Sequence, residues 1–365
     1  MNNSPQKKIE NATPRSFFQA VSTVFRETEK SVGKPIERFY NIAGFSVRLR
    51  FAGPTLMPFI TPALEHLATE AVDNPSLTIC FFDSVSTQAV MPVFPWTKDA
   101  AWQWHIKPIG GQEDNSIKAN YNFGRGILSL LDMSSNVGFY LVRDAQQIPY
   151  YEKGAPMMPI LHWWMLIRGR QLTHGGAIGT EKGGVLLIGK SGSGKSTAAL
   201  SSLNSGLFYA GDDYCLFSND PEPYIHSLYS SAKVNPDNLK NLLSHMQNLV
   251  SNKDHLDSEK ALLFLNEYFP DKMINGFPCR AILIPQISNL KETRLTKTSA
   301  AVILKNLVPN TIFQLNNQVL SLGGEVDIKN FGNLVRQIPG YILEVGTNLS
   351  GIPLAIQDLL NELRA

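Results

Sequence analysis

The sequence predicts an α/β sheet covered by helices, preceded by a mainly β amino-terminal half. Three observations support this prediction. Strand-like and helix-like segments alternate through the second half of the chain, as in a sheet with helices packed on it. A short apolar strand in that half leads into a glycine-rich turn and then a helix, with the pattern G-x-x-x-x-G-K-[ST] at residues 189–196. The length of 365 residues is enough for two domains.

Composition places the chain among globular proteins, with 43% hydrophobic and 18% charged residues. A net charge of +2 is too small to indicate a nucleic-acid partner. No apolar stretch approaches the roughly 20 residues of a membrane span, and the polar start of the chain lacks the core of a signal peptide. We therefore expect a cytoplasmic protein with no membrane and no nucleic-acid partner. The cysteines, Cys80, Cys215 and Cys279, are too scattered to indicate disulfides or zinc.

We expect residues 1–15 to form a mobile tail and residues 16–155 to form an α+β domain. Helical or alternating spacing of apolar residues identifies its elements. They are a helix at 17–32, a strand at 45–51, a helix at 56–67, a strand at 77–83, a loop at 92–108, and strands at 117–123, 127–132 and 139–143. Trp96, Trp102 and Trp104 in the loop are expected to cover a sheet rather than to grip a ligand. We expect this half to recruit the substrate or to regulate the second half.

Residues 156–365 predict the α/β domain. Its expected elements are a buried helix at 157–170, a strand pair within 224–234, a helix at 236–250, a core strand at 280–285, a helix at 299–307, a turn at 323–324, a strand at 341–345, and helices at 326–338 and 352–364 on either side of that strand. Residues 260–268 fit a helix or a strand equally well. His162 is expected to be structural. Less favoured interpretations are a metal cluster within 251–259 and a phosphate contact by Arg280.

The glycine-rich turn predicts a nucleotide site. Glycine lets successive backbone N–H groups turn toward one anion, and the helix that follows adds its unpaired N–H groups. In this pattern Lys195 reaches the β- and γ-phosphates and Ser196 holds Mg²⁺. The residues expected to bind the nucleotide are Gly189, Lys190, Ser191, Gly192, Ser193, Gly194, Lys195, Ser196 and Thr197.

Acidic residues follow the next strand-like run. Asp212 and Asp213 come directly after residues 207–211. Beside a phosphate loop, one carboxylate can hold magnesium and the other can accept a proton from an attacking hydroxyl. His174, just before the first strand of this half, could approach the loop from a neighbouring strand, although a lone histidine is more often structural.

These residues resemble the core of the HPr serine kinase/phosphorylase family. The resemblance lies in His174-Gly-Gly-Ala177, in the loop 189–196 and in Gly211-Asp-Asp213, at matching spacings, and covers about residues 160–217. It implies an HPr kinase-like fold for residues 156–365. It also implies that His174 and Asp213 assist proton transfer, that Lys195 binds phosphates and that Ser196 binds Mg²⁺, which leaves Asp212 as the second candidate metal ligand.

The chain also departs from that family. The amino-terminal half is unlike that of HPr kinase, and the family's glycine-rich segment with a metal-binding glutamate has no clear counterpart. The carboxy-terminal third looks more like a broader group of HPr-kinase-related proteins, among them peptide-tailoring kinases of the lasso-peptide type. The resemblance therefore does not imply that HPr is the substrate or that the protein catalyses the reverse phosphorylase reaction.

The favoured function is an ATP- and Mg²⁺-dependent kinase that phosphorylates a hydroxyl, with serine on a protein or peptide as the expected acceptor. His174, Lys195, Asp212 and Asp213 are the candidate catalytic residues, and Ser196 and Asp212 the candidate metal ligands. Two alternatives stay open: a nucleotide-hydrolysing switch that uses water as the nucleophile, and a kinase for a small-molecule hydroxyl. The resemblance also makes a homo-oligomer possible.

Overall fold

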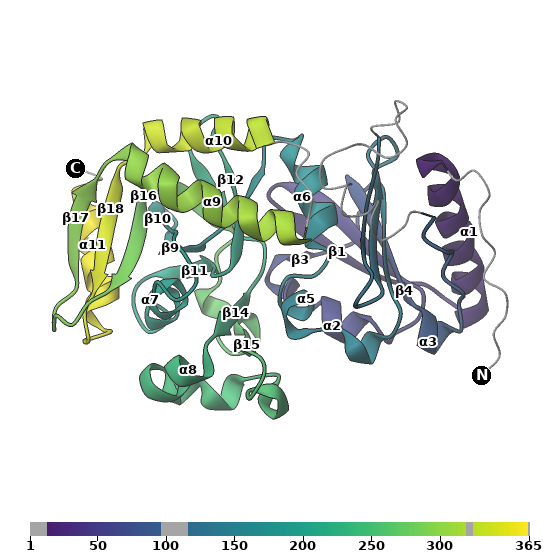
Figure 1. Ribbon diagram of the computed structural model, residues 1–365, viewed down its shortest axis with the longest axis horizontal. Coiled ribbons are helices and arrows are strands. Elements are labelled where there is room, and N and C mark those ends of the chain that lie inside the picture. The colour runs from purple at the N-terminus through teal and green to yellow at the C-terminus, as the bar shows by residue number, and fades with distance from the viewer. Residues whose placement is uncertain (1–12, 96–115, 319–323, 364–365) are drawn as a thin grey trace.

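The computed structural model describes residues 13–95, 116–318 and 324–363 (Figure 1). In Figure 1 the amino-terminal half lies to the right and the carboxy-terminal half to the left, each built on a β-sheet. Across these residues, no helix combines the length and the apolar character needed to cross a bilayer. Trp96, Trp102, Trp104 and Gly323, for which the sequence made predictions, lie outside the described residues.

A mixed sheet forms the amino-terminal half, in the strand order β3-β1-β2-β4-β7-β6-β5. Its strands are β1 (Ile36–Ile42), β2 (Phe45–Phe51), β3 (Ala68–Thr69), β4 (Leu77–Asp83), β5 (Ile117–Asn122), β6 (Ile127–Asp132) and β7 (Val137–Val142). Strand β4 runs parallel to both β2 and β7, whereas hairpin pairs such as β1–β2 and β6–β7 are antiparallel. Short helical segments, α2 (Met57–Ile60) and α3 (Ser84–Thr87), follow β2 and β4.

Helix α1 (Pro14–Val32) covers one face of this sheet. Thr13 caps it, because the Thr13 side chain accepts a hydrogen bond from the Ser16 N–H while the Ser16 hydroxyl reaches back to the start of the helix. Phe17 and Phe25 of the helix bury against Cys80 and Phe82 of β4. Ile79 and Phe81, which alternate with them along the strand, point to the opposite face and into a second core.

The carboxy-terminal half contains the strand path β11-β9-β10-β16-β13-β12-β8, with β18 pairing β16 and β17 pairing β18. The strands are β8 (Gln171–His174), β9 (Gly176–Thr180), β10 (Gly183–Leu187), β11 (Phe208–Gly211), β12 (Tyr214–Ser218), β13 (Tyr224–His226), β16 (Gly276–Ile287), β17 (Arg294–Thr298) and β18 (Gly340–Val345). Strands β10, β16 and β18 are parallel and form its centre. A separate ribbon pairs β14 (Ser231–Val234) with β15 (Ala261–Phe264).

Helices bury both faces of this second sheet. Val185 and Leu187 of β10 share a core with α7 (Lys195–Ser201), α8 (Pro236–Leu242) and α11 (Gly351–Glu362). Leu186 and Ile188 point the other way, toward α9 (Ala300–Gln318) and α10 (Gly324–Gln337). Burial on both faces explains why residues 185–188 are apolar without interruption. The predicted α/β class is therefore confirmed for this half.

Two helices join the halves: α5 (Tyr150–Gly154) and α6 (Met158–Leu166). All nine residues of α6 are buried. Trp164 and Leu161 of α6 belong to one core with Phe81 of the first sheet and Leu216 of the second. The hydrophobic core is thus continuous across the predicted boundary at residues 155–156, and that boundary stays a prediction.

Several predicted elements are confirmed, among them the helix at 17–32, the strands at 45–51, 77–83 and 280–285, and the helices at 326–338 and 352–364. Others were wrong. The helix predicted at 56–67 is α2 plus a 3₁₀ turn at Glu65–Leu67, because Pro62 follows α2 and has no N–H to continue its hydrogen bonding. Residues 13–15 begin α1 and do not belong to a tail.

The prediction of a strand pair within 224–234 was also wrong. Strand β13 pairs with β12 and β16, whereas β14 pairs with β15, so the two strands belong to different sheets. The helix predicted at 236–250 stops at Leu242 and continues as a 3₁₀ turn at Ser244–Leu249. Strands β1, β3, β8, β9 and β17 were not predicted, and the ambiguous segment 260–268 contains β15. His174 was expected just before the first strand of this half, but it is the last residue of β8, and β9 separates it from β10.

His162 of α6 generates a prediction about stability. Its side chain is fully buried, neither ring nitrogen has a partner among the described residues, and burial lowers its pKa to about 4. In the unfolded chain the imidazole takes up a proton as pH falls through about 6.5, whereas in the folded chain it does so only near pH 4. The contribution of neutral His162 to the free energy of unfolding is therefore fully present above pH 6.5 and is lost as pH falls toward 4. We expect His162→Phe to remove up to about 3 kcal/mol of this loss between pH 7 and pH 4, measured by urea unfolding.

The control for this prediction is His245→Gln, at an exposed position, which should leave the pH dependence of the wild type unchanged. An equal fall in unfolding free energy for His162→Phe and the wild type between pH 7 and pH 4 would contradict it.

Candidate functional site

The glycine-rich turn connects β10 to α7, as the sequence predicts. Gly189 and Gly194 have φ angles of 136° and 105°, in the left-handed region that other residues rarely adopt. Gly194 immediately precedes α7, so the turn delivers the chain directly into the first helical residue, Lys195. We call residues 189–196 the phosphate loop; its role in binding phosphate stays a prediction.

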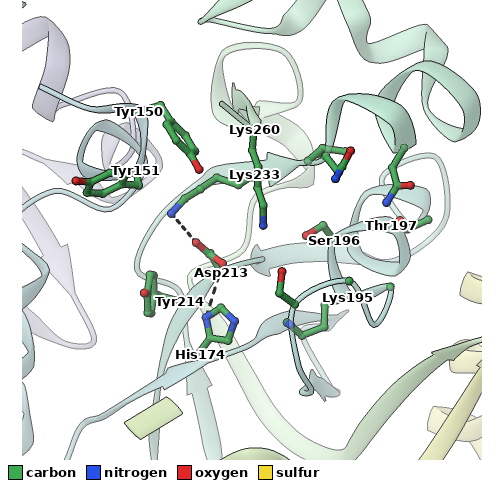
Figure 2. A pocket seen from close by; sticks show the side chains of 16 residues that line it. Tyr150, Tyr151, His174, Lys195, Ser196, Thr197, Asp213, Tyr214, Lys233 and Lys260 are labelled. Carbon is green, nitrogen blue, oxygen red and sulfur yellow. Dashed lines mark ion pairs between the residues drawn. The ribbon is translucent and has the colours of Figure 1, made fainter. Parts of the chain in front are cut away.

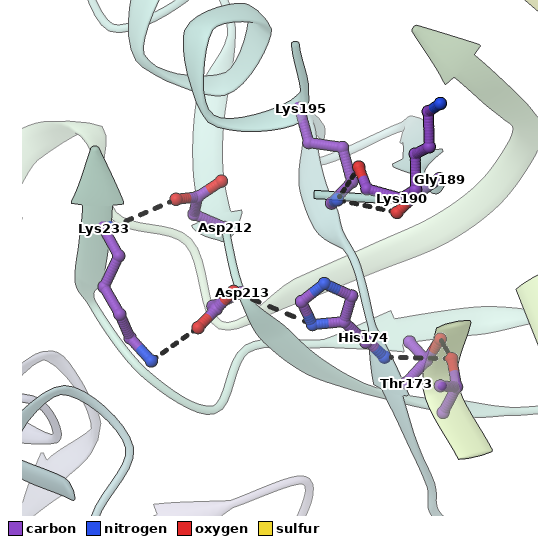
Figure 3. Close-up of polar contacts among 9 residues, drawn as sticks. Thr173, His174, Gly189, Lys190, Lys195, Asp212, Asp213 and Lys233 are labelled. Atoms are coloured by element: carbon purple, nitrogen blue, oxygen red, sulfur yellow. Dashed lines mark hydrogen bonds and ion pairs between the residues drawn. The ribbon is translucent and has the colours of Figure 1, made fainter. Parts of the chain in front are cut away.

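Lys195 folds back over this loop. Its Nζ donates hydrogen bonds to the carbonyl oxygens of Gly189, at 2.7 Å, and Lys190, at 3.2 Å (Figure 3). The side chain is almost completely buried, which lowers the pKa of the ammonium, and the nearby carboxylates of Asp212 and Asp213 oppose that shift. A buried cation therefore lies against the backbone of the loop, where a bound anion is expected.

The turn between β8 and β9 carries His174 to the same edge of the sheet. The Gly175 N–H donates to the carbonyl oxygen of Asp213 at 3.2 Å, and His174 lies opposite Tyr214 in the β8–β12 pair. A Cβ atom on Gly175 would come within 2.7 Å of the Leu187 carbonyl oxygen. The turn can thus pack against the end of β10, next to the phosphate loop, only because residue 175 has no side chain.

Asp213 lies between two basic side chains (Figure 3). Its Oδ2 is 2.5 Å from the Nζ of Lys233, and its Oδ1 is 3.7 Å from the Nδ1 of His174. Burial alone would raise the pKa of this carboxyl, but the Lys233 ammonium and His174 outweigh burial and hold it below its usual range. Burial lowers the pKa of His174 to about 4, although Asp213 opposes this, so the imidazole is neutral at pH 7.

Asp212 is buried behind Asp213. Its Oδ2 accepts the backbone N–H of Lys233 at 3.3 Å, whereas its Oδ1 has no hydrogen-bond partner among the described residues. Burial and the neighbouring Asp213 raise the pKa of Asp212 to about 6, and the nearby Ser196 side chain partly offsets the rise. An unpaired carboxylate oxygen next to a serine hydroxyl fits the oxygen ligands that Mg²⁺ prefers.

Within the described ranges, no cluster of three or more histidine, cysteine or acidic side chains could hold a metal by itself. The less favoured metal cluster at 251–259 is therefore not found. Mg²⁺ usually keeps water and substrate phosphate among its ligands, so two protein oxygens are compatible with the predicted site.

A cavity of about 320 Å³ joins these elements (Figure 2). The predicted residues that line it are His174, Ser191, Gly192, Gly194, Lys195, Ser196, Thr197 and Asp213. Lys195 and Asp213 therefore face the same space. Arg280 does not line it: Nη1 of Arg280 pairs with Glu222 at 3.1 Å, at the end of β10 away from the loop.

Sequence reasoning missed the other residues that line this cavity, which are Tyr150, Tyr151, Tyr214, Lys233, Val234, Asn235, Asn238 and Lys260. Lys233 comes from β14, Lys260 immediately precedes β15, and Tyr150 and Tyr151 come from α5 of the amino-terminal half. A lysine inside the otherwise small and apolar strand Ser231–Val234 was a signal that could have identified Lys233. The two tyrosines follow a short loop and carry no comparable signal.

No protein-family model matches the chain, and no curated protein matches it in sequence. The solved structures that it resembles include the Hpr(Ser) kinase/phosphatase from Coxiella burnetii. The match covers 53% of this chain and 99% of that one, with 12% sequence identity and a TM-score of 0.31. This is a distant structural likeness, so we base the functional argument on the geometry of the site.

The close approach at Gly175 generates a prediction. Gly175→Ala places a Cβ against the backbone of β10, which cannot move as a side-chain end could. We expect a loss of about 1–3 kcal/mol in the free energy of unfolding, typical of overpacking, and a weaker affinity for Mg²⁺-ATP. Calorimetric unfolding and titration with nucleotide measure the two effects.

Gly124→Ala is the matched control, because a Cβ there would meet nothing closer than the Asn122 Oδ1 at 3.6 Å. It should change neither quantity. A Gly175→Ala protein with the stability and the nucleotide affinity of the wild type would show that the turn does not need this close approach.

Proposed function

We propose that this protein is an ATP- and Mg²⁺-dependent kinase that transfers the γ-phosphate to a hydroxyl, with a serine of a protein or peptide as the favoured acceptor. The observation that carries the proposal is that Lys195 and Asp213, for which we propose the roles of phosphate-binding cation and proton acceptor, line one cavity. Phosphoryl transfer needs such positioning and charge stabilisation more than covalent chemistry from the protein.

The nucleotide would lie on the phosphate loop. Backbone N–H groups around Gly189–Gly194 would face its phosphates, and the Lys195 ammonium would exchange the carbonyl oxygens of Gly189 and Lys190 for phosphate oxygens. Ser196 and Asp212 would hold Mg²⁺, which supplies charge neutralisation on the phosphates when bound.

The acceptor hydroxyl would enter beside Asp213. Its oxygen attacks the γ-phosphorus, the bond from that phosphorus to the bridging oxygen breaks, ADP leaves, and the hydroxyl proton passes to the Asp213 carboxylate. Figure 2 shows Tyr150 and Tyr151 on one side of Asp213, and Ser196 and Thr197, in the first turn of α7, on the other. This extension of the cavity past Asp213 supports a substrate larger than water.

Lys195→Met tests the nucleotide site. We expect it to weaken Mg²⁺-ATP binding and to abolish detectable transfer, because the buried cation facing the phosphates is lost. The measurement is binding of a fluorescent ATP analogue together with transfer of labelled γ-phosphate. Lys329→Met, on the exposed face of α10, is the charge-matched control. Wild-type nucleotide affinity in the Lys195→Met protein would rule out this role.

Asp213→Asn tests the proton acceptor. We expect a fall in kcat of about 10² to 10⁴, the range for loss of a general base, with ATP affinity retained. Labelled ATP and serine-containing peptides provide the assay, and Asp358→Asn on the surface of α11 is the control. Transfer at the wild-type rate would refute the assignment of the base. Label recovered only as free phosphate from the wild type would instead indicate a nucleotide-hydrolysing switch.

A further inference from the structure

We infer that the amino-terminal half positions the acidic pair of the site: helix α5 fixes the Lys233 side chain, and Lys233 fixes Asp213. The inference rests on the proposed function in that Asp213 is taken as the proton acceptor. It gives the amino-terminal half a part in positioning the proton acceptor, in addition to any recruitment of substrate. Lys233 is a positioning residue in this scheme.

Lys233 contacts both aspartates. Its backbone N–H donates to Oδ2 of Asp212 at 3.3 Å, and its ammonium lies 2.5 Å from Oδ2 of Asp213. The Lys233 side chain is only 9% exposed, so water screens this ion pair weakly. One residue of the β14–β15 ribbon therefore holds the metal-side and the acceptor-side carboxylates in a fixed relation.

Helix α5 packs against the stem of the same lysine. A Cβ atom built on Gly154, the last residue of α5, would lie 3.2 Å from Cε of Lys233 and 2.9 Å from Cδ1 of Leu262. The Ser231 hydroxyl donates a hydrogen bond to the Gly154 carbonyl oxygen, which ties α5 to β14. Glycine at position 154 leaves the space in which the lysine stem runs.

A second contact leads back to the first sheet. Tyr140 of β7 donates a hydrogen bond from its hydroxyl to Oε2 of Glu152, in α5, at 2.8 Å. Burial raises the pKa of the Glu152 carboxyl, and the Tyr140 hydroxyl and the nearby Lys233 ammonium offset part of this rise. The Lys233 ammonium thus lies near two acidic side chains, Asp213 and Glu152 of α5.

Both halves hold the ribbon in place: the Tyr209 hydroxyl of β11 donates to the Ser231 carbonyl oxygen at 2.9 Å, and α5 contacts the ribbon from the amino-terminal half. Two-stranded sheets are marginally stable by themselves, and β14–β15 lies outside the main sheet. The contacts that hold it in place include α5 and the Tyr229 hydroxyl, which donates to the Pro156 carbonyl oxygen at 2.8 Å. A shift of the ribbon relative to β12 would move Lys233 away from Asp213, and a misplacement of about 1 Å can cost 10²-fold in rate.

The experiment is a double-mutant cycle with Gly154→Ala and Lys233→Met. Each single variant should lower kcat by about 10- to 100-fold with KM for ATP within about threefold of the wild type, because the loop is not touched. If Gly154 acts through Lys233, the double variant should be no slower than Lys233→Met alone. Gly332→Ala is the matched control, a helical glycine whose Cβ would meet only Nη2 of Arg336, at 3.5 Å.

The midpoint of thermal unfolding, measured for the same four proteins of the cycle, is a second readout that does not require enzymatic activity. Non-additive shifts in this midpoint support the contact between α5 and Lys233 even if the wild type transfers no phosphate, a result that would refute the proposed function alone. Additive shifts in the midpoint, or a Gly154→Ala protein with wild-type kcat in an active enzyme, would overturn the inference.

Discussion

The site depends on the close approach of three turns at one edge of the second sheet. The phosphate loop follows β10, Asp213 follows β11, and the β8–β9 turn places His174 beside both. The approach is possible because Gly175 lies against the Leu187 carbonyl oxygen, where a Cβ would be only 2.7 Å away. Backbone packing, more than any single side-chain contact, therefore decides that the candidate phosphate-binding lysine and the candidate base share a cavity.

Charge at this cavity is concentrated and largely buried: Lys195, Asp213 and Lys233 line it, and Asp212 lies next to Asp213 without lining it. Lys195 and Lys233 face Asp212 and Asp213, and each of these four side chains is mostly withdrawn from water. Burying charges costs more than well-packed apolar residues would, and removing one member of a buried pair is more costly still. The environments separate the two carboxyls: burial raises the pKa of Asp212 to about 6, whereas Lys233 and His174 hold that of Asp213 low. Such a separation is typical of sites in which two carboxylates have different tasks.

Local signals allowed half of this site to be predicted. The phosphate loop could be recognised because its glycines, lysine and serine are consecutive and their geometry depends on the neighbouring strand and helix alone. Lys233, Gly154 and Tyr150 could not, because their contact with the site arises from packing between distant segments. The same distinction applies to the fold. Strands with clear alternation, such as Phe45–Phe51, were predicted, whereas the partners of β13 and β14 depend on which sheet edge each strand reaches.

A crystal structure of the protein with Mg²⁺ and a non-hydrolysable ATP analogue tests most directly whether Lys195 and Asp213 meet at one bound nucleotide. We predict that the γ-phosphate lies between the Lys195 ammonium and the Asp213 carboxylate, with Mg²⁺ next to Ser196 and Asp212. A triphosphate bound elsewhere, with Lys195 still hydrogen-bonded to the carbonyl oxygens of Gly189 and Lys190, would contradict it.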